Sequence, residues 1–190
     1  MMDCLEAEKV IARHRGDAVV ITSETASHEW PQISSTDLDL PWYGAMGMAS
    51  SVALGLALAA PKRKIIIIDA DGSLLMNLNS LVTIAGMAPA NLIHFVIENG
   101  IYRSTGGQPI PAAGKVSFAG LAKAAGYRHT YELDKLADLE AKVDTIIGQP
   151  GPTLCCLKTP PTTERTIHGF PTGAELIAAY HRVGKAISRS

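Results

Sequence analysis

Short apolar runs alternate along the chain with longer stretches in which apolar residues recur at helical spacing. Four consecutive isoleucines at residues 65–68 are typical of a strand buried on both faces, and residues 92–97 predict a second one. Between these two strands, apolar residues at helical spacing over residues 74–87 predict a connecting helix. Further strands are expected at residues 17–22 and 153–158, and further helices at residues 118–126, 136–147 and after residue 171. This alternation predicts an α/β fold, a doubly wound parallel sheet with helices on both faces.

The two uncertain stretches of this pattern are both expected to be helical. Residues 1–16 mix charged and apolar positions in a short amphipathic pattern, which favours a capping N-terminal helix over a secretory signal. Residues 44–60 are uncharged, but they are rich in Gly, Ala and Ser and fall short of the roughly 20 residues that cross a bilayer. We expect a helix packed under the sheet or at a subunit interface. One domain over residues 1–190 accounts for this length.

Composition narrows the possible partners. The 17 basic and 18 acidic residues are nearly balanced, so no basic stripe for nucleic acid and no polybasic membrane signal is expected. Cys4, Cys155 and Cys156 cannot form a disulfide framework, and the adjacent pair on a strand would point to opposite faces. We therefore expect a cytoplasmic protein that binds neither nucleic acid nor a membrane.

Polar residues follow two of the expected strands at the same edge of the sheet. Asp71 lies just past the isoleucine run, and Asn99 follows residues 92–97. Magnesium prefers hard oxygen ligands and takes only one or two from side chains, which suits this pair. Gly72 and Ser73 would begin a helix whose N–H groups can face a phosphate. The pattern predicts a Mg²⁺-diphosphate site; helix capping by Asp71 and a turn at Asn99 are the alternatives.

Asp71, followed 28 positions later by Asn99, resembles the thiamine-diphosphate motif, in which the Asp of Gly-Asp-Gly precedes an Asn by somewhat under thirty residues. Ala70 replaces the first Gly and Glu98 replaces the first Asn of the usual Asn-Asn pair, but both metal-binding positions are kept. The resemblance implies thiamine diphosphate and Mg²⁺ as cofactors. It also implies that the backbone carbonyl of Ile101 completes the protein ligands.

Two further segments are similar to phosphonopyruvate and sulfopyruvate decarboxylases. Residues 104–109 read Ser-Thr-Gly-Gly-Gln-Pro, like their Ser-x-Gly-Gly-Gln-Pro stretch, and residues 44–47 look like their Gly-Ser-Met-Gly segment. The chain thus resembles the beta subunit of sulfopyruvate decarboxylase and the C-terminal domain of phosphonopyruvate decarboxylase. By this resemblance Met46 supports the bent cofactor, with Gly47 and Tyr102 beside it. Met46 as ordinary core filler is the alternative.

Four more residues are candidates on weaker grounds. Ser23 and Thr25 follow the first strand and could donate hydroxyl hydrogen bonds to the cofactor, although turn or cap chemistry explains them equally well. Arg103 and Ser104 lie beside the expected site. The guanidinium of Arg103 could clamp a substrate anion, or it could be an ordinary solvated loop side chain.

The resemblance implies decarboxylation of a small anionic 2-oxo acid, such as sulfopyruvate or phosphonopyruvate. In these enzymes a glutamate that activates the cofactor comes from a separate pyrimidine-binding domain, so no catalytic residue is assigned here. We expect the diphosphate-binding subunit of a split enzyme that works in a hetero-oligomer with a pyrimidine-binding (alpha) subunit. A subunit of an acetolactate-synthase-like carboligase and a non-catalytic Mg²⁺-diphosphate regulatory module are the alternatives. Three scattered cysteines do not fit the iron-sulfur clusters of a ferredoxin oxidoreductase.

Overall fold

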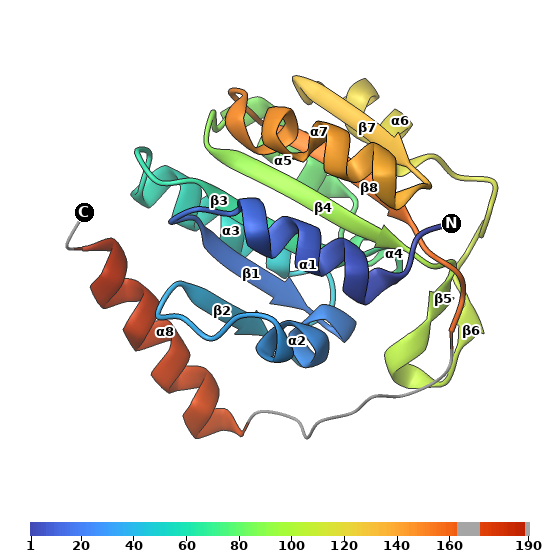
Figure 1. Ribbon diagram of the computed structural model, residues 1–190. Coiled ribbons are helices and arrows are strands. Elements are labelled where there is room, and N and C mark those ends of the chain that lie inside the picture. Colours follow the sequence, from blue (N-terminus) through green and yellow to red (C-terminus); the bar gives the residue numbers. More distant parts are fainter. Residues whose placement is uncertain (163–171, 189–190) are drawn as a thin grey trace.

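A six-stranded parallel sheet forms the centre of the computed structural model, which describes residues 1–162 and 172–188 (Figure 1). The strand order is β2-β1-β3-β4-β8-β7. The strands are β1 (Val19–Ser23), β2 (Asp39–Trp42), β3 (Ile65–Ala70), β4 (Leu92–Glu98), β7 (His129–Leu133) and β8 (Thr153–Lys158). A separate antiparallel pair, β5 (Ile101–Tyr102) and β6 (Gln108–Pro109), follows β4. The doubly wound parallel sheet is confirmed.

Helices cover both faces of this sheet (Figure 1). One face packs against α1 (Cys4–His14), α2 (Thr25–Glu29) and α7 (Leu136–Gly148), with the 3₁₀ turn η1 (Trp30–Gln32). The other packs against α3 (Ala49–Ala59), α4 (Asp71–Leu75), α5 (Asn79–Met87), α6 (Phe118–Ala125) and α8 (Gly173–Ile187). A second 3₁₀ turn, η2 (Arg103–Thr105), lies between β5 and β6.

The isoleucine run supplies both hydrophobic cores at once. Ile65 and Ile67 belong to the core on the α3 face, whereas Ile66 and Ile68 belong to the core on the α1 face. Successive side chains of a strand point to opposite faces, so a strand covered on both sides is apolar throughout. Cys155 and Cys156 of β8 divide in the same way, as expected, and both are free thiols.

Several elements differ from the sequence-based expectation. β2 and β7 lie at the two edges of the sheet, and because most of their residues are only half-buried they lack the apolar run that marks the inner strands. The single helix expected over residues 74–87 is two helices, α4 and α5. Asn77, between them, donates from Nδ2 to the carbonyl of Gly47 at 2.8 Å, which holds the interruption in place.

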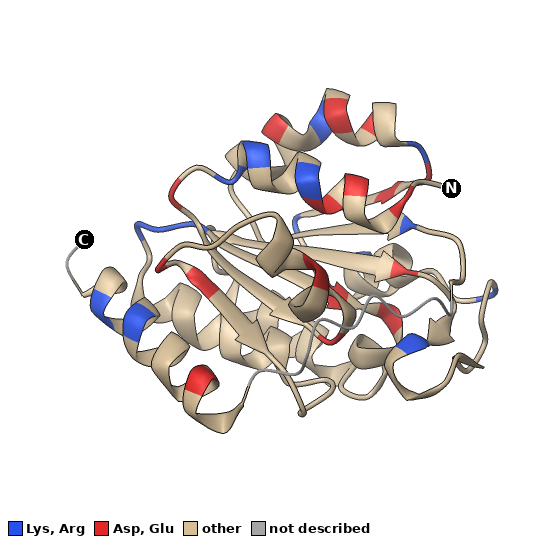
Figure 2. Ribbon diagram, turned by 60° about the horizontal axis from the view of Figure 1, so that its bottom comes forward, with Lys and Arg blue, Asp and Glu red and all other residues tan. Residues whose placement is uncertain are grey.

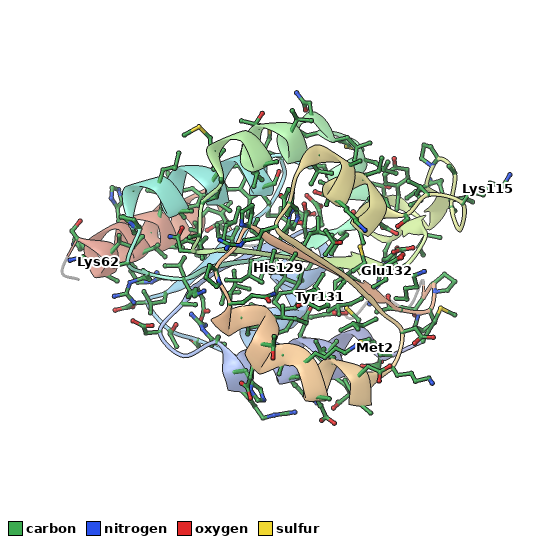
Figure 3. The ribbon with its side chains drawn as sticks, turned by 90° about the horizontal axis from the view of Figure 1, so that it is seen from above. Met2, Lys62, Lys115, His129, Tyr131 and Glu132 are labelled. Carbon is green, nitrogen blue, oxygen red and sulfur yellow. The ribbon has the colours of Figure 1, made fainter. Side chains whose placement is uncertain are left out.

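The edge strand β7 carries polar contacts along its length. Figure 3 shows His129, Tyr131 and Glu132 along this strand. The Tyr131 hydroxyl lies 3.1 Å from Nε2 of Gln149, and Glu132 forms an ion pair of 3.3 Å with Lys158 of β8. The backbone N–H of Met2 donates to the carbonyl of Lys158 at 3.1 Å. The start of the chain is therefore fastened to the end of β8.

Charged side chains are unevenly distributed among the helices (Figure 2). α1 and α7 carry acidic and basic residues, whereas α3 and α5 carry none. Among the described residues, no helix combines the length and the apolar character that crossing a bilayer requires.

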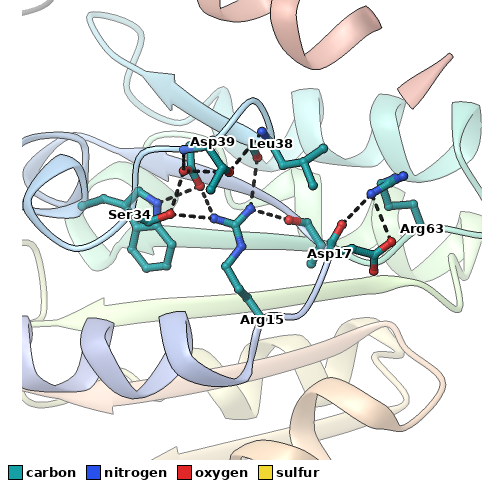
Figure 4. A network of polar contacts seen from close by, with 9 residues as sticks. Arg15, Asp17, Ser34, Leu38, Asp39 and Arg63 are labelled. Atoms are coloured by element: carbon teal, nitrogen blue, oxygen red, sulfur yellow. Dashed lines mark hydrogen bonds and ion pairs between the residues drawn. The ribbon is translucent and has the colours of Figure 1, made fainter. Parts of the chain in front are cut away.

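A buried ion pair joins β2 to the rest of the sheet at the edge where the strands begin (Figure 4). The guanidinium of Arg15 contacts the Asp39 carboxylate, and both side chains are largely buried. Asp39 also accepts hydrogen bonds from Trp30 Nε1 at 2.9 Å and from the Ser34 hydroxyl at 2.7 Å. Burial alone would raise the pKa of Asp39, but these donors and the charge of Arg15 lower it. The network therefore stabilises the carboxylate form.

Asp39→Asn should lower the free energy of unfolding by about 3 kcal/mol, because it leaves the Arg15 charge buried without its counter-ion. The pKa of Asp39 is lower in the folded protein than its value of about 3.9 in the unfolded chain. The stabilisation by the ion pair is therefore complete above about pH 3.9 and is lost as the pH falls through the pKa of the folded state. Urea unfolding at neutral and acidic pH measures both effects.

Asp37→Asn is the matched control. Asp37 lies two residues away, and its side chain is 77% exposed and 3.8 Å from Arg182. Its replacement should change the free energy of unfolding by less than about 0.5 kcal/mol. Equal effects of the two substitutions would show that the buried pair does not stabilise the fold.

Candidate functional site

Asp71 lies where β3 ends and α4 begins, and its side chain is fully buried. Its Oδ1 accepts the backbone N–H of Gly72 and its Oδ2 accepts that of Gly100, both at 2.7 Å. The second bond crosses from β3 to the chain that leaves β4. It is possible because the parallel register pairs Ala70 with Ile97, so that the two strands end side by side.

Asn99 follows β4 and is also buried, with 8% of its surface exposed. Its Oδ1 accepts the backbone N–H of Ile101 at 2.9 Å. Gly100 between them has φ +74°, a conformation that glycine adopts without strain. Asn99 lines two cavities, one of about 350 Å³ and one of about 220 Å³ that Asp71 also lines. The structure thus brings Asp71 and Asn99 together at the carboxyl edge of the sheet.

The environment of Asp71 is unfavourable for a lone negative charge. Burial raises the pKa of Asp71 to about 6, although hydrogen bonds from the amides of Gly100 and Gly72 oppose this shift. Each carboxylate oxygen has accepted one hydrogen bond and keeps a further lone pair. A hard divalent cation would offset the burial cost, so the donor set of Asp71 and Asn99 fits Mg²⁺.

Gly72 is required by a close contact with the chain that follows Asn99. A Cβ atom at this position would lie 2.7 Å from two ring carbons of Tyr102 and 3.3 Å from the Ile110 side chain. Tyr102, in β5, therefore packs directly on the backbone beside Asp71. The sequence predicts both residues at the site. The structure shows in addition that the Tyr102 ring occupies the space that a side chain at residue 72 would need.

The loop that carries Met46 is fastened to the start of α4. Gly47, with φ +81°, donates its N–H to the Ser73 hydroxyl at 3.0 Å and accepts from Asn77 Nδ2 at 2.8 Å. Met46 itself is half-buried, and Met48 is 45% exposed. Met46, Gly47 and Ser73 therefore lie in one connected region with Asp71.

Ser23 ends β1 beneath this region, and its hydroxyl donates to Oδ1 of the fully buried Asp69. Burial alone would raise the pKa of Asp69, but His94, Ser23 and Ser73 together lower it. His94 Nε2 lies 3.5 Å from Asp69 Oδ2. Sequence reasoning missed Asp69 and His94. The available signal was a charged residue at the end of a fully apolar strand.

Thr25 begins α2 and is half-buried, directly after an unusual residue. Glu24 has φ +48° and ψ −112°, and it is 5% exposed. Within the described residues its Oε1 has no hydrogen-bond partner. Burial raises the pKa of Glu24, and the nearby charge of Asp69 adds to this. A glycine would adopt this backbone conformation more readily, so Glu24 is a strained position next to the site.

Arg103 and Ser104 lie in η2, and both are partly buried. Arg103 Nη1 donates to Glu29 Oε1 at 2.7 Å, with only 11% of the Arg103 side chain exposed. Arg103 and Asn99 line the same 350 Å³ cavity. The alternative of a solvated loop arginine does not hold, because the guanidinium is buried against a carboxylate beside the site.

Residues 21–156 match the family described as "Thiamine pyrophosphate enzyme, C-terminal TPP binding domain". The chain belongs to this family. It is 39% identical over 155 residues to a phosphonopyruvate decarboxylase of Streptomyces viridochromogenes, a match that covers 81% of this chain and 38% of the relative. It is 34% identical to "Sulfopyruvate decarboxylase subunit beta" of Methanocaldococcus jannaschii, and there the match covers 83% of this chain and 84% of the relative.

Solved structures support the same family fold. A putative thiamin diphosphate-dependent enzyme from Mycobacterium smegmatis superposes with a TM-score of 0.71 at 20% identity, over 85% of this chain and 32% of that one. The chain thus spans well under half the length of this structure and of the Streptomyces relative. The expected thiamine-diphosphate-binding domain is confirmed, and Asp71, Asn99 and Tyr102 all lie within the matched residues.

Asp71→Asn should stabilise the metal-free protein at neutral pH. The pKa of Asp71 is about 6 in the folded protein and about 4 in the unfolded chain, so the unfolded chain ionises first as the pH rises. The free energy of unfolding therefore falls between these two pH values, and above about pH 6 the total loss is about 3 kcal/mol. One amide donor loses its acceptor, so we expect a net gain of about 1–2 kcal/mol at pH about 7.5 and none at pH about 4.5. Urea unfolding without Mg²⁺ measures this difference, and a destabilised variant at neutral pH would contradict the assigned environment.

Gly72→Ala should displace Tyr102, since the added Cβ would overlap its ring. We expect a loss of about 1–3 kcal/mol in the free energy of unfolding. Gly86→Ala, on the exposed side of α5 with no atom within 4 Å of the added Cβ, is the control and should gain up to about 1 kcal/mol. Similar outcomes for the two variants would argue against the close contact.

Proposed function

We propose that this chain is the diphosphate- and Mg²⁺-binding subunit of a split thiamine-diphosphate-dependent decarboxylase of anionic 2-oxo acids. The observation that carries the proposal is the pairing of Asp71 and Asn99 at the ends of β3 and β4, inside the matched cofactor domain. The printed names of two relatives, a phosphonopyruvate decarboxylase and a sulfopyruvate decarboxylase beta subunit, suggest the reaction.

In this proposal the chain holds the cofactor at one end. Asp71, Asn99 and the Ile101 carbonyl ligate Mg²⁺, and Gly72, Ser73, Ser23 and Thr25 lie toward the diphosphate. Met46, Gly47 and Tyr102 contact the organic part. When bound, thiamine diphosphate supplies the electron sink for loss of carbon dioxide from a 2-oxo acid. The role of the chain is to fix the cofactor, because rigid positioning of the reactive group lowers the barrier.

A second chain completes the site in this proposal and supplies the activating glutamate. Surface composition favours such a partner: large apolar side chains are exposed on and around α3 and α5, two helices that carry no charged residues. They are Met48, Leu58, Met76, Val82 and Met87, each between 45% and 63% exposed. Exposed apolar side chains concentrated on one side of a protein commonly mark an interaction surface.

The substrate is proposed to carry a compact anion, such as the sulfonate of sulfopyruvate or the phosphonate of phosphonopyruvate. Arg103 is the one cationic side chain among the described residues that line the 350 Å³ cavity next to Asn99. Its Nη1 donates to Glu29 Oε1, which fixes the guanidinium at the wall of this cavity. Ser104 follows it in the same turn.

Alone, the chain should release negligible carbon dioxide from sulfopyruvate or phosphonopyruvate, even with thiamine diphosphate and Mg²⁺. Together with a pyrimidine-binding partner it should release carbon dioxide and an aldehyde, and Asp71→Ala should abolish this reaction. Robust turnover by the single chain would overturn the split-subunit proposal. An acyloin product in place of the aldehyde would indicate the carboligase.

Thermal shift separates the enzyme from a regulatory diphosphate binder. Thiamine diphosphate with Mg²⁺ should raise the melting temperature of the assembled protein far more than ADP with Mg²⁺ does, because binding to the folded state alone stabilises it. Equal shifts would favour the regulatory module.

A further inference from the structure

Three side chains that could ligate a metal meet on the α1 face of the sheet, beside the ion pair of Glu29 with Arg103. Cys4 and Glu8 come from consecutive turns of α1, where an i, i+4 spacing places both on one side of the helix. Glu29 comes from the end of α2. One ligand atom from each lies within 4.8 Å of the others, and in the absence of metal the Cys4 thiol donates a hydrogen bond to Glu8 Oε1, with Sγ and Oε1 3.7 Å apart.

Two carboxylate oxygens in this cluster are buried without a partner among the described residues. Glu8 is 0% exposed and its Oε2 receives no hydrogen bond. Glu29 is 7% exposed; Arg103 satisfies its Oε1, but its Oε2 also receives none. Buried polar atoms in native proteins nearly always have a partner. A cation bound between the three side chains would supply this partner to both oxygens.

We propose that Cys4, Glu8 and Glu29 form a binding site for a divalent cation, with Zn²⁺ as the best fit. A tetrahedral zinc ion with Zn–S of about 2.3 Å and Zn–O of about 2.0 Å separates sulfur from oxygen by about 3.5 Å, close to the observed distance between Cys4 and Glu8. Mg²⁺ suits this site poorly because it prefers oxygen ligands alone. The cluster is therefore chemically distinct from the pair Asp71 and Asn99.

Solvent can reach the cluster from one side. Cys4 and Glu29 line the 350 Å³ cavity, so a water molecule can take the fourth position on the metal. Burial and the charge of Glu29 raise the pKa of both Cys4 and Glu8, while the charge of Arg103 opposes the shift in both. On binding, the thiol of Cys4 and any protonated carboxyl group would release their protons to solvent.

A metal ion at this site would be linked through Glu29 to the segment that follows Asn99. Glu29 would bridge the metal and Arg103, and Arg103 belongs to the segment that follows Asn99. The ion would connect the first turn of α1 and the end of α2 to this segment. Metal binding would thereby stabilise one wall of the cavity beside the cofactor site, because a ligand that binds only the folded state stabilises it.

Cobalt(II) titration of the full 190-residue chain tests the proposal, since Co²⁺ replaces Zn²⁺ and a thiolate ligand gives an ultraviolet charge-transfer band. We expect the band in the native protein with one equivalent of metal, its loss in Cys4→Ser, and at least about tenfold weaker Co²⁺ binding in Glu8→Gln. Asp71→Asn should keep the band, which separates this site from the one at Asp71.

Glu6→Gln is the matched control, because Glu6 lies on the same helix but is exposed and pairs with Lys9. It should keep both the band and the affinity. Circular dichroism without metal verifies that the Cys4→Ser and Glu8→Gln variants are folded. Absence of the band in the native protein, or a band that persists in Cys4→Ser through Cys155 or Cys156, would overturn the proposal.

Discussion

The contact between the Asp71 carboxylate and the backbone amide of Gly100 is the interaction on which the candidate site depends. It joins the end of β3 to the chain leaving β4, and it forms because two inner parallel strands end at the same level. The carboxylate is fully buried and its pKa is raised to about 6, so the protein holds it at an energetic cost. A group held at such a cost at the carboxyl edge of an α/β sheet fits a ligand-binding role better than a structural one.

The rest of the fold keeps that contact in place. The apolar strands β3 and β4 are covered on both faces, which fixes where they end. The hydrogen bond of Ser23 to Asp69 and those of Gly47 hold the neighbouring loops. At the opposite edge of the sheet, Arg15 and Asp39 fasten the outer strand β2. Polar groups are thus buried at both ends of the sheet: Arg15 and Asp39 at the start of the strands are paired, whereas some oxygens at the carboxyl ends, in Glu24 and Glu29, lack partners within the described residues.

The inner strands and the closeness of Asp71 to Asn99 were predictable because their signals are local. A run such as residues 65–68 has few structural alternatives, and Asp71, three residues after it, is expected at the end of the strand. The edge strands β2 and β7 were not predictable from apolar pattern, because half-exposed strands contain few consecutive apolar residues. The cluster of Cys4, Glu8 and Glu29 and the pairing of Arg103 with Glu29 were also missed. They join residues up to 74 positions apart, and only the packing of α1, α2 and η2 brings them together.

A double-mutant cycle on cofactor binding tests most directly whether Asp71 and Asn99 hold the same ion. Calorimetric titration of thiamine diphosphate with Mg²⁺ would compare the native protein, Asp71→Ala, Asn99→Ala and the double variant, each assembled with the partner chain. The account predicts that each single substitution abolishes most of the Mg²⁺-dependent affinity and that the double variant loses little more, because both residues act through one metal. Losses that add, or an Asn99→Ala protein that binds as tightly as the native one, would contradict it.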